Sequence, residues 1–359
     1  MFICELSALS VDHSLYLWIT LSSSANYLCA SVDHSLLICE LSVCICGSLS
    51  PSVDHSLQYT PSEAIQNTSA NQTSNKQPAT SNQQQATSNQ QPANNFTMPI
   101  NIAIQAAIHA GDQILKIYDD PGADFSVEKK ADNSPLTIAD KASHEVIHKM
   151  LSSTGLPILS EEGRDIPFEE RKNWETFWLV DPLDGTKEFI KRNGEFTVNI
   201  ALIENNKPVM GIIYVPVTQT LYVGQTSSGA WKLEKATGKI TLETLQKQGI
   251  RLPQTINGRP YTIVGSRSHR NPETEKYIAA RNKEHPQMEI LSRGSSLKIC
   301  MVAEGQADEY PRFGPTMEWD TAAGHAIANA SGKKCWLTNL EQEMSYNKEN
   351  LLNPWFIVQ

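Results

Sequence analysis

The chain has 359 residues and a formal net charge of −9, from 30 Lys and Arg residues against 39 Asp and Glu residues. This acidic balance argues against a protein that binds nucleic acid through bulk electrostatics, because neutralising phosphates requires a basic surface. No run of about 18 apolar residues occurs, so the sequence predicts no transmembrane helix. The length is sufficient for one large domain or two smaller ones.

Residues 1–97 differ from the rest of the chain and predict an extension. Ser-Val-Asp-His-Ser-Leu occurs three times, at 10–15, 31–36 and 52–57, and the residues between the copies keep no apolar pattern. From 61 to 97, 25 of 37 residues are Ser, Thr, Asn or Gln, and so polar a segment cannot offset its ordering entropy by burial. We therefore expect a low-complexity, repeat-bearing and disordered extension over 1–97, followed by one catalytic domain over 98–359.

The extension also has two functional interpretations, a metal site and a secretory signal. Its cysteines and histidines offer a metal site made by Cys39, Cys44 and Cys46 with His34 or His55. That spacing matches no standard zinc pattern, and the start of the chain lacks the basic residues of a secretory signal. We expect that Met98 is the natural start, or that residues 1–97 are an upstream repeat that is read in frame.

The distribution of the cysteines along the chain indicates the cellular compartment of the protein. Five of the seven cysteines lie in the first 46 residues, which leaves only Cys300 and Cys335 in the main body. Two isolated cysteines make no disulfide framework, so the sequence predicts a reduced, cytoplasmic protein.

From Met98 onward, apolar residues recur first at helical spacing. They predict a helix from about 100 to 118, ended by Asp-Asp-Pro-Gly, and a second helix from about 137 to 153. Short apolar strands follow at 156–159 and 177–180.

The apolar period then changes to two. This alternation predicts an antiparallel meander with strands at 196–203, 209–215 and 221–223. Later patterns predict a strand at 261–264 and helices at 296–304 and 321–330. Because blocks of strands alternate with blocks of helices, we expect a layered α+β fold.

Carboxylates follow two of the apolar strands and open the last helix. They belong to three clusters: Ser160-Glu161-Glu162-Gly163, Asp181-Pro-Leu-Asp184-Gly185-Thr186 and Glu318-Trp319-Asp320-Thr321. Gathered in one cleft, these groups would repel one another unless a hard cation such as Mg²⁺ lay between them. Pro182 makes a corner at which Asp181 and Asp184 can face one ion or bridge two. Gly185 and the N–H groups after it would attract an anion, so the pattern indicates phosphoryl chemistry.

Each acidic residue also has a purely structural interpretation. Asp140 completes a capping box if Thr137 begins it, Glu161 fits a solvated loop, and Asp320 fits the N-terminus of a helix. The occurrence of all three clusters in one chain, in this order, favours the site.

Three motifs carry a resemblance to a known family. They are Glu161-Glu162, Trp178-Leu-Val-Asp-Pro-Leu-Asp-Gly-Thr186 and Trp319-Asp-Thr-Ala-Ala-Gly324. In this order they resemble the inositol monophosphatase superfamily of Mg²⁺-dependent, Li⁺-sensitive phosphatases, from about Met98 to the C-terminus. The resemblance implies a layered αβαβα sandwich.

Further segments resemble one branch of that superfamily. They are Asp184-Gly-Thr-Lys-Glu-Phe189, Ser266-Arg-Ser-His269, Gly294-Ser-Ser-Leu-Lys298 and Tyr310-Pro-Arg-Phe-Gly-Pro315. These segments look like bacterial 3′(2′),5′-bisphosphate nucleotidases of the CysQ type. That resemblance implies hydrolysis of the 3′-phosphate of adenosine 3′,5′-bisphosphate, a by-product of sulfate activation and sulfotransfer, to AMP and phosphate.

The resemblance also implies roles for single residues. The Mg²⁺ ligands would be Glu161, Asp181, the Leu183 carbonyl, Asp184 and Asp320. Thr186, oriented by Asp140, would position the attacking water with help from Glu161, and the amides of Gly185 and Thr186 would hold phosphate oxygens. The residues expected around the substrate are Glu161, Leu183, Asp184, Gly185, Thr186 and Asp320.

Ser295, Lys298 and Arg312 are candidates for the second phosphate and the sugar. A bisphosphate needs cationic partners beyond the metal ions, and the guanidinium fork suits phosphate. The alternative places Lys298 on a solvated helix face and pairs Arg312 with Asp308 or Glu309.

Three rival functions remain. The same chemistry on inositol monophosphate or on fructose 1,6-bisphosphate differs only in substrate, and a non-catalytic metal- or nucleotide-binding relative differs in class. Some members of the superfamily associate peripherally with membranes, which would place the chain at the inner membrane face, although no amphipathic anchor is evident.

Overall fold

The chain forms two compact units, Met1–Gln85 and Ala86–Gln359. The computed structural model describes residues 98–120, 122, 136–163, 165–265 and 271–359 with their side chains. It describes the backbone alone of Thr97, of residues 128, 129 and 135, and of four strands before residue 45. In these described parts, no helix is long and apolar enough to cross a membrane.

The first unit contains a four-stranded antiparallel sheet. Its strands are β1 (Cys4–Val11), β2 (Ser14–Leu21), β3 (Asn26–Asp33) and β4 (Ser42–Cys44), in that order. The first repeat copy includes the end of β1 and the start of β2, and the sequence did not predict the pairing of these strands. The disorder expected for the polar segment and the alternative metal site lie outside the described residues, so both stay predictions.

A seven-stranded sheet forms the centre of the second unit. Its strands are β7 (Ile158–Ser160), β8 (Thr176–Asp184), β9 (Thr197–Glu204), β10 (Lys207–Val215), β11 (Thr220–Gln225), β12 (Gly229–Leu233) and β13 (Ile250–Leu252). They lie in the order β13-β12-β11-β10-β9-β8-β7, and of the neighbouring pairs only β7 and β8 run parallel. The predicted meander is confirmed, and β12 and β13 extend it.

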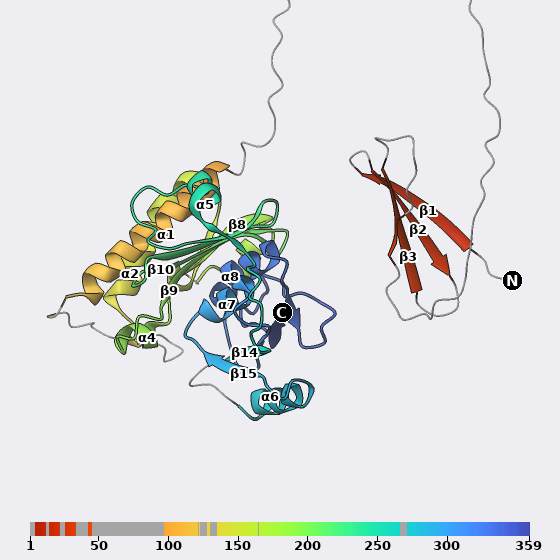
Figure 1. Ribbon diagram of the computed structural model, residues 1–359. Coiled ribbons are helices and arrows are strands. Elements are labelled where there is room, and N and C mark those ends of the chain that lie inside the picture. Colours follow the sequence, from red (N-terminus) through yellow and green to blue (C-terminus); the bar gives the residue numbers. More distant parts are fainter. Residues whose placement is uncertain are drawn as a thin grey trace, which may run out of the picture. The chain divides into compact units, whose positions relative to one another are not determined.

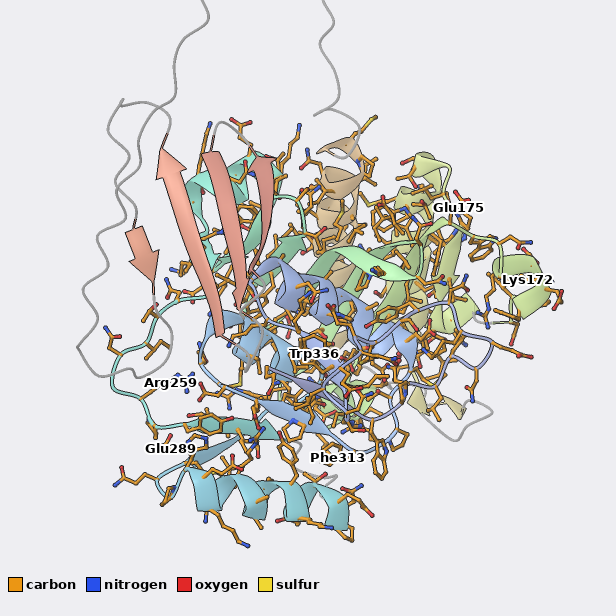
Figure 2. The ribbon with its side chains drawn as sticks, turned by 90° about the vertical axis from the view of Figure 1, so that its right-hand side faces the viewer. Lys172, Glu175, Arg259, Glu289, Phe313 and Trp336 are labelled. Atoms are coloured by element: carbon orange, nitrogen blue, oxygen red, sulfur yellow. The ribbon has the colours of Figure 1, made fainter. Side chains whose placement is uncertain are left out.

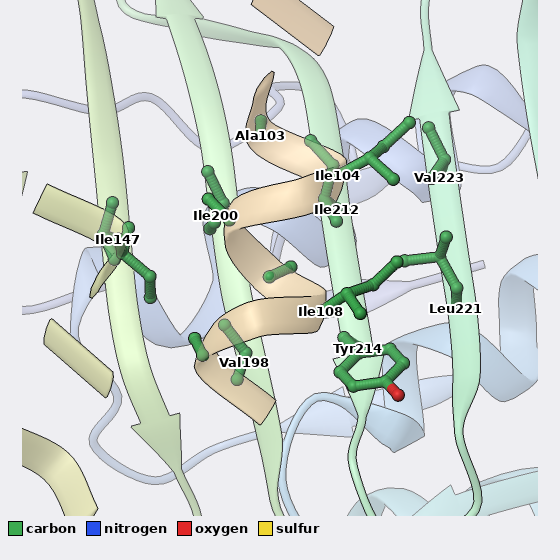
Figure 3. Close-up of a cluster of buried hydrophobic side chains, with 14 of the residues drawn as sticks. Ala103, Ile104, Ile108, Ile147, Val198, Ile200, Ile212, Tyr214, Leu221 and Val223 are labelled. Carbon is green, nitrogen blue, oxygen red and sulfur yellow. The ribbon is translucent and has the colours of Figure 1, made fainter. Parts of the chain in front are cut away.

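Helices α1 (Thr97–Tyr118), α2 (Ile138–Leu151) and the short α5 (Leu242–Gln248) pack on one face of this sheet (Figure 1). Figure 3 shows Ile104 and Ile108 of α1 against Ile200, Ile212 and Leu221 of the strands. All five side chains are fully buried because alternate residues of each strand face the helices. The two predicted helices are confirmed, with α1 beginning earlier than expected.

Helices α7 (Leu297–Glu304) and α8 (Glu318–Ala330) cover the opposite face (Figure 1). Helix α8 lies very close to the sheet because two strand glycines face it. A Cβ atom on Gly211 would lie 2.1 Å from the Ala323 carbonyl oxygen, and one on Gly224 would lie 2.5 Å from the Ile327 Cα. Small residues on both sides therefore fix the depth at which α8 sits.

A second, smaller sheet layer lies beyond α7 and α8. It contains β14 (Thr262–Gly265), β15 (Glu289–Ser292), β16 (Tyr310–Arg312), β17 (Cys335–Leu337) and β18 (Phe356–Val358). An isolated bridge from Ile263 to Glu309 links the parallel pair β14-β15 to the antiparallel set β16-β18-β17. Helix α6 (Pro272–Glu284) lies outside this layer, on the side of the molecule where Figure 2 shows Glu289 and Arg259. The expected αβαβα sandwich is confirmed.

The remaining elements are short. They are the strand pair β5 (Glu128–Lys129) and β6 (Pro135–Leu136), the 3₁₀ turns η1 (Ser152–Thr154) and η2 (Glu161–Gly163), and the helices α3 (Phe168–Arg171) and α4 (Thr186–Ile190). Figure 2 shows Lys172 and Glu175 just after α3. Several of these elements contain too few residues to give a periodic signal, so the sequence did not predict them.

Two predicted boundaries near the acidic clusters are wrong. Helix α8 begins at Glu318, three residues before the predicted start, because the Asp320 carboxylate accepts the backbone N–H of Met317 at 2.8 Å and caps the helix earlier. Strand β8 continues to Asp184, and its pairing with β9 is irregular between Asp181 and Asp184, where Pro182 lacks an N–H group.

Gly211→Ala should destabilise the second unit, because the added methyl group meets the backbone of α8. We expect a loss of about 2–3 kcal/mol in the free energy of unfolding, measured by urea denaturation, as for an overpacked core. Gly265→Ala is the matched control, since nothing lies within 4 Å of a Cβ at that strand glycine. Equal losses in the two variants would contradict the close approach of α8.

Candidate functional site

Two parallel strands bring the first two acidic clusters together. Ser160 of β7 is in register with Val180 of β8. Glu161, the residue after β7, and Asp181 of β8 therefore lie at the same end of these two neighbouring strands. Asp181 is 1% exposed, so its carboxylate is held inside the protein.

The turn from Asp181 to Asp184 is fixed by hydrogen bonds. Oδ1 of Asp181 accepts the backbone N–H of Leu183 at 3.0 Å. The Ser143 hydroxyl of α2 donates to the Pro182 carbonyl at 2.6 Å. These bonds hold the corner between the two aspartates.

Asp184 is bound from the opposite side by the residue that precedes α7. Ser296 donates to Oδ2 of Asp184 through its backbone N–H and through its hydroxyl, each at 2.7 Å. Asn199 of β9 donates to the same oxygen at 3.3 Å and to the Ser296 hydroxyl at 2.8 Å. All three donors reach one oxygen, so the other can face a cation.

Asp320 lies in the first turn of α8, close to the other carboxylates. The Ser296 hydroxyl also lies 2.9 Å from the Asp320 carbonyl and so links α7 to α8. Burial raises the pKa of the Asp320 carboxyl well above its usual range, and the charges of Asp184 and Glu161 raise it further. The three carboxylates therefore share one electrostatic field, which a cation would relieve.

Asp140 has both of the roles that the sequence left open. Its Oδ2 accepts the backbone N–H and the hydroxyl of Thr137, at 2.8 and 2.5 Å, and so completes the capping box of α2. Its Oδ1 accepts the Thr186 hydroxyl at 3.3 Å. The structure thus brings the predicted water-positioning pair into contact.

Gly185 separates Asp184 from Thr186 and permits a tight approach. Its φ of +96° is in the left-handed region, which favours glycine. A Cβ atom there would lie 2.1 Å from the Ser295 hydroxyl oxygen, which lies 2.9 Å from each of its two possible acceptors, the backbone carbonyls of Asp184 and Glu195. Ser295, a predicted substrate contact, thus supports the loop, and its role toward substrate stays a prediction.

The donor set fits a hard divalent cation. All the candidate ligands are oxygens: the carboxylates of Glu161, Asp181, Asp184 and Asp320 and the carbonyl of Leu183. Over the described ranges, no group of three or more His, Cys, Asp or Glu side chains is gathered tightly enough to form a cage for one metal ion. Mg²⁺ does not need such a cage, because it keeps several waters and often takes only one or two carboxylates together with substrate phosphate.

Cations line the same cleft, which has a volume of about 390 Å³. Its walls include Asp184, Gly185 and Asp320, and its cationic lining consists of Lys187, Lys191, Arg293, Lys298 and Arg312. Glu188 and Glu195 also line it. A cleft in which these five cations stand beside the carboxylates of the candidate metal site suits a ligand that carries more than one phosphate.

The alternative interpretation of Lys298 is wrong, because its side chain is 7% exposed and lies in the cleft wall. Its Nζ donates to the Ser295 carbonyl at 2.6 Å. Burial lowers the pKa of the Lys298 ammonium to about 8, and the nearby Asp184 charge opposes that shift.

Arg312 does not form the ion pair that the alternative predicted. Asp308 binds Arg259, with its Oδ1 accepting from Nη2 at 2.7 Å, and Glu309 pairs with Arg281 at 2.7 Å. The Nε of Arg312 is buried and has no hydrogen-bond partner in the part of the chain that the structure describes. An unused guanidinium N–H beside the cleft is suited to an anionic ligand.

Several supporting residues were not predicted. Ser296 and Asn199 hold Asp184, Ser143 holds the corner at Pro182, and Lys187 and Lys191 line the cleft. Only the Gly-Ser-Ser segment gave a signal, since a strand asparagine and a helix serine look ordinary in a sequence. Arg267 and His269, in the segment Ser266-Arg-Ser-His269 that carries part of the resemblance, lie outside the described residues.

Three kinds of comparison, with family models, with curated sequences and with solved structures, identify proteins that are similar to this chain. A family model described as the inositol monophosphatase family matches residues 98–354. A curated Shigella flexneri protein named 3'(2'),5'-bisphosphate nucleotidase CysQ is 47% identical over 260 residues, which cover 71% of this chain and 96% of that protein. The Haemophilus influenzae protein of the same name is 34% identical over 264 residues, which cover 72% and 91%.

Solved structures agree with these matches. The crystal structure of CysQ from Bacteroides thetaiotaomicron is 53% identical, has a TM-score of 0.68, and overlaps 74% of this chain and 98% of that chain. The inositol monophosphatase from Anabaena is 21% identical with a TM-score of 0.53 over 74% and 90% of the two chains, and shows likeness of fold alone.

Asp320→Asn should stabilise the metal-free protein and remove the effect of Mg²⁺. We expect the free energy of unfolding in a chelator to rise by about 1 kcal/mol, the scale of one pKa unit, because a repelled carboxylate is replaced by a neutral amide. In the wild type, Mg²⁺ at about 100 times its Kd should add about 2.7 kcal/mol, and the variant should lose most of this gain.

The measurement for Asp320→Asn is urea denaturation with chelator and with Mg²⁺. Asp165→Asn, at an exposed position, serves as the control and should behave like the wild type. If Asp320→Asn kept the full Mg²⁺-dependent gain, Asp320 would not be a ligand.

Proposed function

The chain belongs to the inositol monophosphatase family, and we propose that it is a 3′(2′),5′-bisphosphate nucleotidase that hydrolyses the 3′-phosphate of adenosine 3′,5′-bisphosphate to AMP and phosphate. The cleft carries this proposal, because it combines a carboxylate site for metal with cations that a single phosphate does not require. The names of the curated relatives support the same substrate.

Mg²⁺, held by Glu161, Asp181, Asp184, Asp320 and the Leu183 carbonyl, would supply charge stabilisation at the phosphate and a more acidic water. The side chains of the protein provide the positioning. The carboxylates are fixed before substrate arrives, by Ser296 at Asp184 and by the capping bond at Asp320.

Thr186 and Asp140 orient the attacking water. Because the Thr186 hydroxyl donates its proton to Oδ1 of Asp140, the lone pairs of its oxygen remain to accept a hydrogen bond from water. Oδ2 of Asp140 is fixed by the N-terminus of α2, so the acceptor cannot turn away. The backbone amides of Gly185 and Thr186 face the phosphate oxygens, so this chemistry needs orientation and charge and no covalent intermediate.

The second phosphate lies against the cationic wall in this proposal. Lys298 and Arg312 come from α7 and β16, which meet at the cleft. Lys187 of α4 and Lys191, the residue that ends this helix, stand about one helical turn apart. Two lysines at this spacing repel each other on a helix, and an anion relieves that repulsion.

The proposed compartment is the cytoplasm. Cys300 and Cys335 are both buried free thiols in the described main body, as a reducing environment allows. Sensitivity to Li⁺ belongs to the same proposal.

The direct test is phosphate release from adenosine 3′,5′-bisphosphate, with and without Mg²⁺, by the full chain and by residues 98–359. We expect release that depends on Mg²⁺, falls on addition of Li⁺, and is similar for both chains. Inositol monophosphate and fructose 1,6-bisphosphate are the comparison substrates and should react much more slowly. Preference for either of them would replace the assigned substrate, and nucleotide binding without any release would indicate a non-catalytic relative.

Arg312→Met should distinguish the second phosphate from the first. A hydrogen bond to a charged group contributes about 1.5–3 kcal/mol, so we expect kcat/KM for adenosine 3′,5′-bisphosphate to fall about 10- to 100-fold. For adenosine 3′-monophosphate, which lacks the 5′-phosphate, kcat/KM should change little.

Lys172→Met, which removes an exposed lysine beside α3, is the control for the lost charge. Equal losses on the two nucleotides would place Arg312 at the reacting phosphate and contradict the proposed arrangement.

A further inference from the structure

A chain of buried polar side chains lies behind Asp320, between α8 and the segment that joins β17 to β18. The hydroxyl of Thr321, the residue after Asp320, lies 3.3 Å from the Tyr346 hydroxyl. The Tyr346 oxygen lies 3.0 Å from Nδ1 of His325, and Nε2 of His325 lies 3.3 Å from Oε2 of Glu343. Thr321, His325 and Tyr346 are at most 2% exposed.

One arrangement of protons satisfies every group in this chain. Lys334 and the His325 ring hold the pKa of Glu343 down to about 2, so Glu343 is an acceptor and His325 donates through Nε2. Burial lowers the pKa of His325, so the ring is neutral and Nδ1 accepts the Tyr346 proton. The Tyr346 oxygen is then left to accept the Thr321 hydroxyl proton, for which the Glu318 carbonyl at 3.2 Å is the other acceptor.

Asn353 joins the other end of the chain to the start of α8. Its Nδ2 lies 3.0 Å from the Thr321 hydroxyl oxygen and 2.7 Å from the Met317 carbonyl. The Met317 N–H in turn donates to Oδ2 of Asp320. Hydrogen bonds therefore join the residues on both sides of Asp320 to one segment. In the same segment, the backbone N–H of Asn347 donates to the Glu318 carboxylate at 2.7 Å.

These hydrogen bonds oppose the fraying of the first turn of α8. The first turn of a helix lacks half of its backbone hydrogen bonds and frays readily. Asp184 and the backbone of Asp320 lie 2.7 and 2.9 Å from the same Ser296 hydroxyl, so these two acidic residues are close neighbours and their repulsion adds to that tendency.

We propose that Tyr346 and His325 are positioning residues that hold Asp320 in the orientation that binds the metal ion. This inference rests on the proposed function, because it assigns the two side chains a part in metal affinity. Groups that orient a metal ligand commonly change affinity by about 10- to 100-fold, without touching the ion.

The test compares two Tyr→Phe variants of the full chain. Tyr346→Phe removes the hydroxyl that joins Thr321 to His325. Tyr214→Phe removes a buried hydroxyl on the opposite face of the sheet, which lies 3.2 Å from the Ala236 carbonyl. Tyr346→Phe loses two buried hydrogen bonds and Tyr214→Phe loses one, so a purely structural role predicts a larger loss of stability in Tyr346→Phe but the same Mg²⁺ dependence in both variants.

The readout is the melting temperature as a function of Mg²⁺ concentration, with phosphate release as a second readout. We expect Tyr346→Phe to need about tenfold more Mg²⁺ for half-maximal stabilisation, and Tyr214→Phe to match the wild type. The Mg²⁺ concentration for half-maximal activity should shift in the same proportion.

A second pair of variants separates positioning from loss of packing. The amide of His325→Asn can take the place of Nδ1 and still accept from Tyr346, whereas that of His325→Gln reaches toward the Nε2 position. Both variants lose ring packing and stability, but only His325→Gln should weaken Mg²⁺ binding.

The outcomes separate this inference from the proposed function. Wild-type Mg²⁺ affinity in both Tyr346→Phe and His325→Gln would overturn the positioning role and leave the proposed function intact. Weakened Mg²⁺ binding in those variants, without phosphate release by the wild type, would support the positioning role and contradict the function. A wild type that Mg²⁺ does not stabilise would overturn both.

Discussion

Repulsion among the carboxylates of the site is the constraint on which the arrangement of the surrounding elements depends. Burial and the charges of Asp184 and Glu161 raise the pKa of the Asp320 carboxyl, and hydrogen bonds from the surrounding elements hold Asp184 and Asp320 in place. The Ser296 hydroxyl lies 2.7 Å from Oδ2 of Asp184 and 2.9 Å from the Asp320 carbonyl oxygen, so α7 and α8 meet at the point of greatest repulsion. The fold stabilises the arrangement that a cation needs before the cation arrives.

The sequence predicted those parts of the structure that repeat or that stand next to one another in the chain. The meander from β9 to β11 alternates with a period of two, and α1 and α2 each keep an apolar stripe over several turns. The corner at Pro182 and the contact of Asp140 with Thr186 followed from local chemistry and from a recognised motif. These features are the ones that a short stretch of residues specifies by itself.

Contacts between distant segments could not be predicted in this way. Nothing about Asn199 distinguishes it from any other polar residue in a strand, although its amide reaches both Asp184 and Ser296. The early start of α8 depends on Asp320 capping its own helix, and the partners of Arg259 and Arg281 decide which arginine stays available at the cleft. Which groups form hydrogen bonds or ion pairs depends on competition among side chains that only the folded chain brings together.

The hydrogen bonds between Ser296 and Asp184 span 112 residues of the sequence. Closing so long a loop costs entropy that no local contact repays, and contacts of this kind form late when a chain folds. During synthesis, β8 and its aspartates leave the ribosome well before α7 and α8 do. The growing chain therefore carries an incomplete set of the proposed ligands for most of its translation, and the carboxylates come together only when the C-terminal third has folded.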